Sequence, residues 1–176
     1  MLNDPIPPHV DPRKLADRGV SITGTLQLAD LERLCDPLSD NVGTVQAKFD
    51  FERDEQHVVV IHSELDVEVK MVCQRCLDVV VLPIHSECDY AVVKEGANTQ
   101  SVPKGYDVLE VGEEPLDLMG LIEDELLLAL PIVPAHAPED CQQPAGLLDE
   151  PEPSVDEVKR SNPFSVLAQL KRDPNV

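Results

Sequence analysis

The chain has 176 residues, which suits one domain with a hydrophobic core, and 42% of them are hydrophobic but only 3% aromatic. The formal net charge of −20 repels phosphate backbones and argues against extensive nucleic-acid binding unless the few basic residues cluster. No stretch resembles a signal peptide or approaches the roughly 20 apolar residues that cross a bilayer, so we expect a cytoplasmic protein without membrane contact.

The first part of the chain predicts two short helices and one strand. Residues 11–19 predict a helix that Asp11 caps and Gly19 ends. Residues 20–26 alternate as a strand does, and residues 28–35 carry leucines at helical spacing.

Three long segments then alternate between apolar and polar residues: 42–54, 57–73 and 77–93. They predict an antiparallel β-meander, and Pro83 in the third predicts a bulge or an edge position. One face of the second segment is predicted to be buried; it consists of Val59, Ile61, Ser63, Leu65, Val67, Val69 and Met71.

The clearest helix is predicted at residues 115–130, after a short strand at 106–111. Its apolar stripe consists of Leu118, Leu121, Ile122, Leu126 and Ala129. We interpret the consecutive acids Glu123, Asp124 and Glu125 as a solvated face, because neighbouring helical residues point about 100° apart.

The predicted fold class is α+β: an antiparallel meander, barrel-like if it closes, flanked by helices and followed by an acidic linker and a C-terminal helical motif. Residues 1–136 form the predicted α+β domain. Residues 137–161 form the linker, which is rich in proline and acidic side chains. Residues 162–176 contain the helical motif.

Five cysteines, an odd number without a secretion signal, argue against a disulfide framework. Cys73 and Cys76 form a CxxC pair in the predicted turn between two long strands. A redox CxxC usually opens a helix, whose N-terminus lowers the thiol pKa, whereas a turn between strands is typical of zinc knuckles. A reduced hairpin turn without a metal is the alternative.

Zinc would need two further ligands, and the candidates are Cys88, His85, His136 and Cys141. His136 and Cys141 follow the clearest helix directly, with four residues between them, so they could fold back and complete a Cys3His tetrahedron. We interpret Cys35 and Cys88 as small core residues. The expected cofactor is therefore a structural zinc ion, or none.

The last motif, NPFSVLAQLKR at residues 162–172, has the pattern of a short amphipathic helix. It is a candidate partner-binding motif, and docking on its own domain is the alternative. The candidate residues are Asn162, Pro163, Phe164, Leu167 and Leu170.

The sequence contains no glycine-rich phosphate loop, nucleophile elbow or HExxH motif, so we expect no catalytic residues and no enzyme.

Three motifs in one order resemble the bacterial YceD family, described as large ribosomal RNA subunit accumulation proteins. They are CQRC, IEDELLLALPIVPAH followed by Cys141, and NPFSVLAQLKR; the early stretch VDPRKLADRGVSITGTL fits the same pattern. In looser relatives a cysteine pair follows the helix where this chain has His136 and Cys141. The resemblance thus favours a metal site at Cys73, Cys76, His136 and Cys141.

The resemblance implies a non-enzymatic factor in ribosome biogenesis that supports accumulation of 23S ribosomal RNA. The acidic charge favours a basic ribosomal or assembly protein as the partner, with 23S rRNA associated indirectly. One alternative is direct binding of pre-ribosomal RNA through the basic tail of Lys159, Arg160, Lys171 and Arg172. The other is a thiol redox protein.

Overall fold

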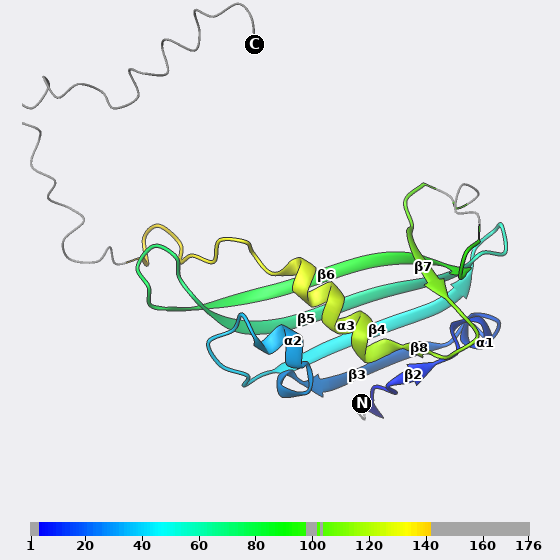
Figure 1. Ribbon diagram of the computed structural model, residues 1–176, viewed down its shortest axis with the longest axis horizontal. Coiled ribbons are helices and arrows are strands. Elements are labelled where there is room, and N and C mark those ends of the chain that lie inside the picture. The colour runs from blue at the N-terminus through cyan, green and yellow to red at the C-terminus, as the bar shows by residue number, and fades with distance from the viewer. Residues whose placement is uncertain (1–3, 98–101, 103, 142–176) are drawn as a thin grey trace, which may run out of the picture. The chain divides into compact units, whose positions relative to one another are not determined.

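The computed structural model describes residues 4–97, 102 and 104–141 (Figure 1). The compact unit that contains the sheet ends at Cys141. The predicted helical motif at 162–176, and the linker from residue 142 onward, lie outside the described residues.

The elements are, in chain order, β1 (Asp4–Pro5), β2 (His9–Val10), α1 (Pro12–Ala16), β3 (Ser21–Gln27), the 3-10 helix η1 (Leu28–Asp30), α2 (Glu32–Cys35), β4 (Thr44–Arg53), β5 (Val59–Val72), β6 (Val79–Lys94), β7 (Asp107–Val111), β8 (Leu116–Asp117) and α3 (Leu118–Ala129). The α+β fold class is thereby confirmed.

A six-stranded sheet in the order β1-β3-β4-β5-β6-β7 forms the frame of the molecule. The predicted meander of three strands is its centre, since β4, β5 and β6 pair antiparallel in sequence order. β3, the strand predicted at residues 20–26, pairs antiparallel with β4. β1 and β7 join the two edges in parallel, and β2 pairs with β8 in a separate two-stranded sheet. Because β1 and β7 do not pair with each other, the described sheet is open, and the barrel-like closure is not observed.

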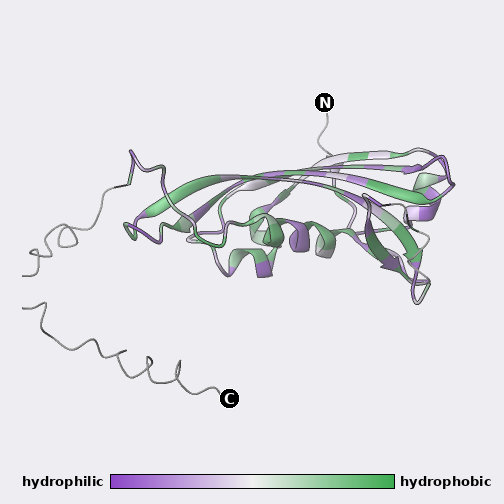
Figure 2. Ribbon diagram, turned by 90° about the horizontal axis from the view of Figure 1, so that it is seen from above, coloured by the Kyte–Doolittle hydropathy of each residue, from purple (hydrophilic) through white to green (hydrophobic). Residues whose placement is uncertain are grey.

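The core lies between one face of the sheet and the helices α2 and α3, which lie on the same side of it (Figure 2). Every residue of the predicted face of β5, from Val59 to Met71, is buried, and on the opposite face only Val60 is also buried. Leu118, Leu121, Ile122 and Leu126 of α3 meet that face, as the helical spacing predicts.

Pro83 lies at a free edge of β6 and not in a bulge. The pairing of β5 with β6 continues without interruption through Glu68 and Pro83. On its other side, β6 pairs with β7 only from Tyr90 to Lys94. A proline, which has no N–H to donate, is therefore accommodated where no neighbouring strand needs one.

Aspartate side chains cap the N-termini of α1 and α3. The Asp11 side chain accepts from the backbone N–H groups of Arg13 and Lys14, both at 3.2 Å, and Gly19 at φ +59° turns the chain after α1. Asp117 accepts from the N–H of Gly120 at 3.1 Å and fixes the start of α3. The C-terminal end of α3 then points toward the end of the sheet where β5 turns into β6 (Figure 1).

Candidate metal centre

The turn between β5 and β6 places Cys73 and Cys76 on the same side. The N–H of Cys73 donates to the carbonyl of Asp78, and the N–H of Leu77 donates to the carbonyl of Cys73, each at 2.9 Å. Leu77 completes the turn with a left-handed backbone, at φ +66°. Both cysteines are buried in consequence.

The segment after α3 runs back against this turn. Prolines at positions 131 and 134 cannot continue the helix, and the carbonyl of Pro134 accepts from the N–H of Gln74 at 2.9 Å. The guanidinium of Arg75 donates to the carbonyl of His136 at 3.1 Å. These bonds bring His136 and Cys141 to the CxxC turn.

The structure thus gathers the four predicted side chains in one cluster, Cys73, Cys76, His136 and Cys141, with all ligand atoms within 4.8 Å of one another. Cys73 Sγ lies 3.9 Å from Cys141 Sγ, and Cys76 Sγ lies 3.3 Å from His136 Nδ1. Zinc bonded to thiolate sulfur and imidazole nitrogen at its usual lengths would separate two sulfurs by about 3.8 Å and a sulfur from a nitrogen by about 3.6 Å. The spacing of the cluster therefore fits a tetrahedral ion.

Hydrogen bonds with neighbouring groups orient two of these side chains, His136 and Cys141. His136 Nε2 lies 3.1 Å from the carbonyl oxygen of Val79. A carbonyl only accepts, so Nε2 carries the proton and Nδ1 presents its lone pair to the cluster. Arg75 Nε donates to Cys141 Sγ at 2.8 Å and so fixes the direction of that side chain.

The two turn cysteines differ in acidity. A hydrogen bond from the backbone N–H of Cys76 lowers the pKa of Cys73 to about 5, against the opposing effect of burial. At Cys76 the N–H of Asp78 acts to lower the pKa, but burial and the sulfurs of Cys73 and Cys141 outweigh it and raise the pKa to about 11. A zinc ion at this cluster would displace the proton of Cys76, because the metal binds the thiolate form of cysteine.

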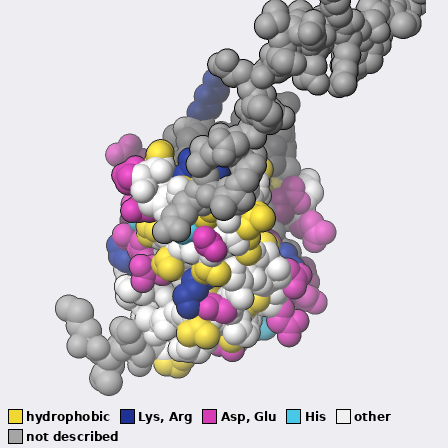
Figure 3. Space-filling model, turned by 90° about the vertical axis from the view of Figure 1, so that its left-hand side faces the viewer, with side chains coloured by type: hydrophobic (Ala, Val, Ile, Leu, Met, Phe, Trp, Pro, Cys, Tyr) yellow, Lys and Arg dark blue, Asp and Glu magenta, His cyan; other side chains and the backbone are white. Residues whose placement is uncertain are grey.

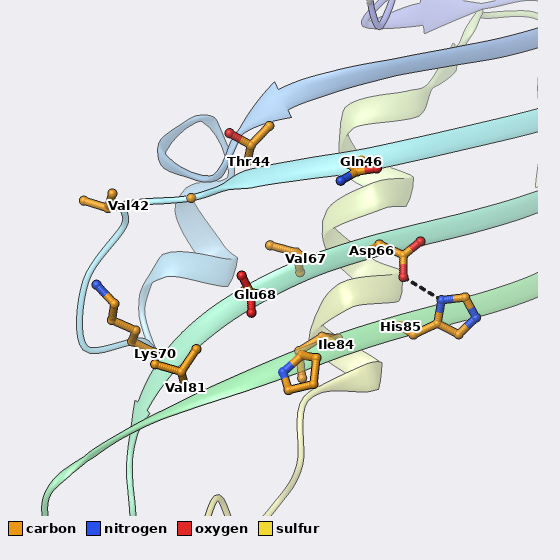
Figure 4. A pocket seen from close by; sticks show the side chains of 12 residues that line it. Val42, Thr44, Gln46, Asp66, Val67, Glu68, Lys70, Val81, Ile84 and His85 are labelled. Atoms are coloured by element: carbon orange, nitrogen blue, oxygen red, sulfur yellow. Dashed lines mark hydrogen bonds and ion pairs between the residues drawn. The ribbon is translucent and has the colours of Figure 1, made fainter.

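The other candidate ligands lie elsewhere. His85 pairs with Asp66 on the outer face of the sheet, where the two line a hollow that the cluster does not share (Figure 4). Cys88 Sγ donates to Asp107 at 3.3 Å, and burial raises its pKa to about 11. The proposed partner-binding residues 162–170 lie outside the described part of the chain.

The interpretation of the three acids of α3 as a solvated face is wrong for two of them. Glu123 is only 8% exposed, and its carboxylate accepts from the backbone N–H groups of Arg33 at 2.6 Å and Leu34 at 3.2 Å. Glu125 accepts from Ser86 of the sheet at 3.2 Å. A helical wheel places Glu125 in phase with Leu118 and so could have found it; no local signal marks Glu123, whose partners lie ninety residues away.

Fold and cluster together define a class: a small acidic α+β protein whose central hairpin turn and post-helical segment share a Cys3His site. The chain belongs to the YceD family. The family profile described as "Large ribosomal RNA subunit accumulation protein YceD" matches residues 61–171. A protein of that same name from Haemophilus influenzae is 34% identical over 173 residues, which cover 95% of this chain and 97% of the relative.

No solved structure matches the chain. Among the described residues, no helix has the length and apolar character that spanning a membrane requires.

Proposed function

We propose that this protein is a non-enzymatic factor in ribosome biogenesis that supports the accumulation of 23S rRNA in the large subunit. The observation that carries the proposal is the similarity, over nearly the full length of both chains, to the H. influenzae protein, whose name refers to accumulation of the large ribosomal RNA subunit. The aligned part of the chain includes all the segments that build the metal cluster. The similarity therefore extends over the whole fold and is not limited to one motif.

The direct test is deletion of the gene. Cells that lack it should contain less 23S rRNA relative to 16S rRNA, and a plasmid copy of the wild-type gene should restore the ratio. An unchanged ratio during rapid growth would contradict the proposed function.

The proposed partner is a basic ribosomal or assembly protein. The net charge of −20 supports this choice, because the field around such a chain attracts cationic proteins and repels RNA. Association with 23S rRNA is then indirect.

The proposed cofactor is zinc in a structural role, bound by Cys73, Cys76, His136 and Cys141. Four protein ligands close the coordination sphere and leave no position for a reacting water, so the ion would contribute folding free energy and not catalysis. The position of the CxxC pair between two strands, and not at a helix N-terminus, supports metal binding over the redox alternative.

Metal analysis of protein purified without a histidine tag tests this assignment. We expect one zinc per chain, and a lower content in the Cys141→Ser variant. The matched control is Cys88→Ser, which removes a thiol outside the cluster and should leave the zinc content unchanged. Wild-type protein with far less than one zinc per chain would refute the metal site while leaving the biogenesis role open.

A further inference from the structure

Exposed hydrophobic side chains gather at the end of the structure that holds the Cys3His cluster. Figure 3 looks onto this end and shows hydrophobic and acidic side chains side by side. All the large exposed hydrophobic residues of the described chain except Val108 lie near the turn, the end of α3 or the loop before β4; they are Val42, Val72, Leu77, Val79, Val81, Leu128, Ile132 and Val133. Such a concentration at one end of the described structure is typical of an interaction site.

This end of the structure contains a groove of about 590 Å³. Val72, Leu77 and Ile132 are its exposed walls, and Ile132 is 94% exposed. Partly buried leucines also line it: Leu38, Leu127 and Leu130. We call these six residues the apolar groove.

Leu77 is not explained by the needs of the fold. Its backbone is left-handed, at φ +66°, where a side chain with a Cβ costs about 1 kcal/mol relative to glycine. Its side chain is 71% exposed, so packing within the described chain offsets little of that free-energy cost. A leucine at such a position is accounted for if another molecule covers it.

The charges around the groove select the chemistry of that molecule. Two exposed carboxylates, Asp36 and Asp78, adjoin the lining residues Pro37 and Leu77 in the chain, and within the described residues neither has an ion-pair partner. The nearby cations are engaged, since Lys70 pairs with Asp40 at 2.7 Å and Arg75 binds Cys141. The groove is therefore apolar inside, and its rim, meaning the residues next to the lining in the chain, carries exposed carboxylates without ion-pair partners among the described residues.

We infer that the apolar groove binds a segment of the basic partner protein in which hydrophobic side chains are flanked by Lys or Arg. This inference rests on the proposed function for the class of partner, and the charge complementarity of the rim selects the segment. The Cys3His cluster would hold the two walls of the groove together, because Leu77 and Ile132 belong to the two segments that the cluster joins.

Site-specific photocrosslinking in growing cells identifies what occupies the groove. The full-length protein carries p-benzoylphenylalanine at position 132, and a control carries it at position 108, which is exposed on β7 away from the groove. We expect position 132 alone to crosslink to a basic protein, at a segment with apolar residues between Lys or Arg. Crosslinks to residues 142–176 of the same chain, to a second copy or to RNA would each overturn the inference.

Two variants then test the groove in a binding assay. The probe is the basic partner protein that the crosslink identifies, purified on its own. Leu77→Gly and Ile132→Ser should each weaken its binding by about tenfold or more, as loss of a central apolar anchor does. Leu77→Gly should also keep or raise the midpoint of urea unfolding, because it relieves the left-handed strain. Unchanged affinity in both variants would contradict the inference.

His57→Gly is the matched control, since His57 has φ +63° in the turn at the opposite end of β5. It should raise stability in the same way and leave the affinity unchanged. The ratio of 23S to 16S rRNA separates the two proposals. A normal ratio in cells with the groove variants refutes partner binding at the groove alone. A normal ratio in deletion cells refutes the role in ribosome biogenesis.

Discussion

A single carboxylate connects the two helical elements that cover the sheet. Glu123 of α3 accepts from two backbone N–H groups at the start of α2 and from Arg33 Nε at 2.7 Å. Glu123→Ala would leave buried donors without a partner, which costs about 1–3 kcal/mol for each such group. We therefore expect a loss of roughly 2–3 kcal/mol in the free energy of unfolding, measured by urea denaturation.

The neighbouring Asp124 is the control for that prediction. It contacts the same arginine, through Nη1 at 2.7 Å, but its side chain is 59% exposed and accepts no backbone donor in the described chain. Asp124→Ala should cost less than about 1 kcal/mol, as exposed ion pairs do. Equal losses for the two variants would show that the ion pair, and not the backbone contacts, carries the stabilisation.

His62 on the outer face supplies a pH dependence. Partial burial acts to lower its pKa, but the carboxylates of Asp89 and Glu52 outweigh it and hold the pKa above 6.5. These pairs contribute their full stability below about pH 6.5 and lose it as the pH rises through the raised pKa. An NMR titration should show the raised pKa directly.

Asp89→Asn should lower the pKa of His62 in the same titration. It should leave His85 unchanged, because the carboxylates of Asp66 and Glu87 raise the pKa of that ring. A midpoint for His62 that does not respond to Asp89→Asn would show that the pair does not persist in solution.

At the level of elements, the sequence predicts those strands and helices whose position follows from a local pattern of apolar and polar residues. β4, β5 and β6 follow from alternation, because one face meets the core and the other meets water over ten or more residues. The two-residue strands β1, β2 and β8 leave no such pattern, since pairing with distant segments defines them. The same distinction holds for the site: CxxC is a local signal, whereas Arg75 and the apolar groove depend on how residues 131–141 fold back.

The proposed zinc ion should hold the segment of residues 131–141 in place. Chelation of the bound ion should speed hydrogen exchange at the Gln74 N–H, which bonds to Pro134, on the order of tenfold or more as the segment detaches locally. Amides in the centre of the sheet, such as that of Phe49 on β4, should keep their protection. Equal exchange at Gln74 with and without the ion would mean that hydrogen bonds alone fix the segment.

At the scale of the whole molecule, charge favours a protein over RNA as the proposed partner. Acidic residues number 34 against 14 basic ones. Many of the basic side chains that the structure describes are already in ion pairs with carboxylates; these are Lys14, Arg33, Lys48, Arg53 and Lys70. Half of the ten basic side chains that the structure describes are thus engaged, which weakens the displacement of counterions from a phosphate backbone, the source of most non-specific RNA affinity.

The isolated protein should therefore bind large-subunit RNA fragments poorly at physiological salt and basic large-subunit proteins well. The protein complex should weaken as salt rises, because exposed charges are screened over about 8 Å at physiological ionic strength. Parallel titrations by gel shift and by fluorescence anisotropy measure both. Tight, salt-sensitive RNA binding that disappears when Lys159, Arg160, Lys171 and Arg172 are changed to Ala would assign recognition to the basic tail and reverse the choice of partner.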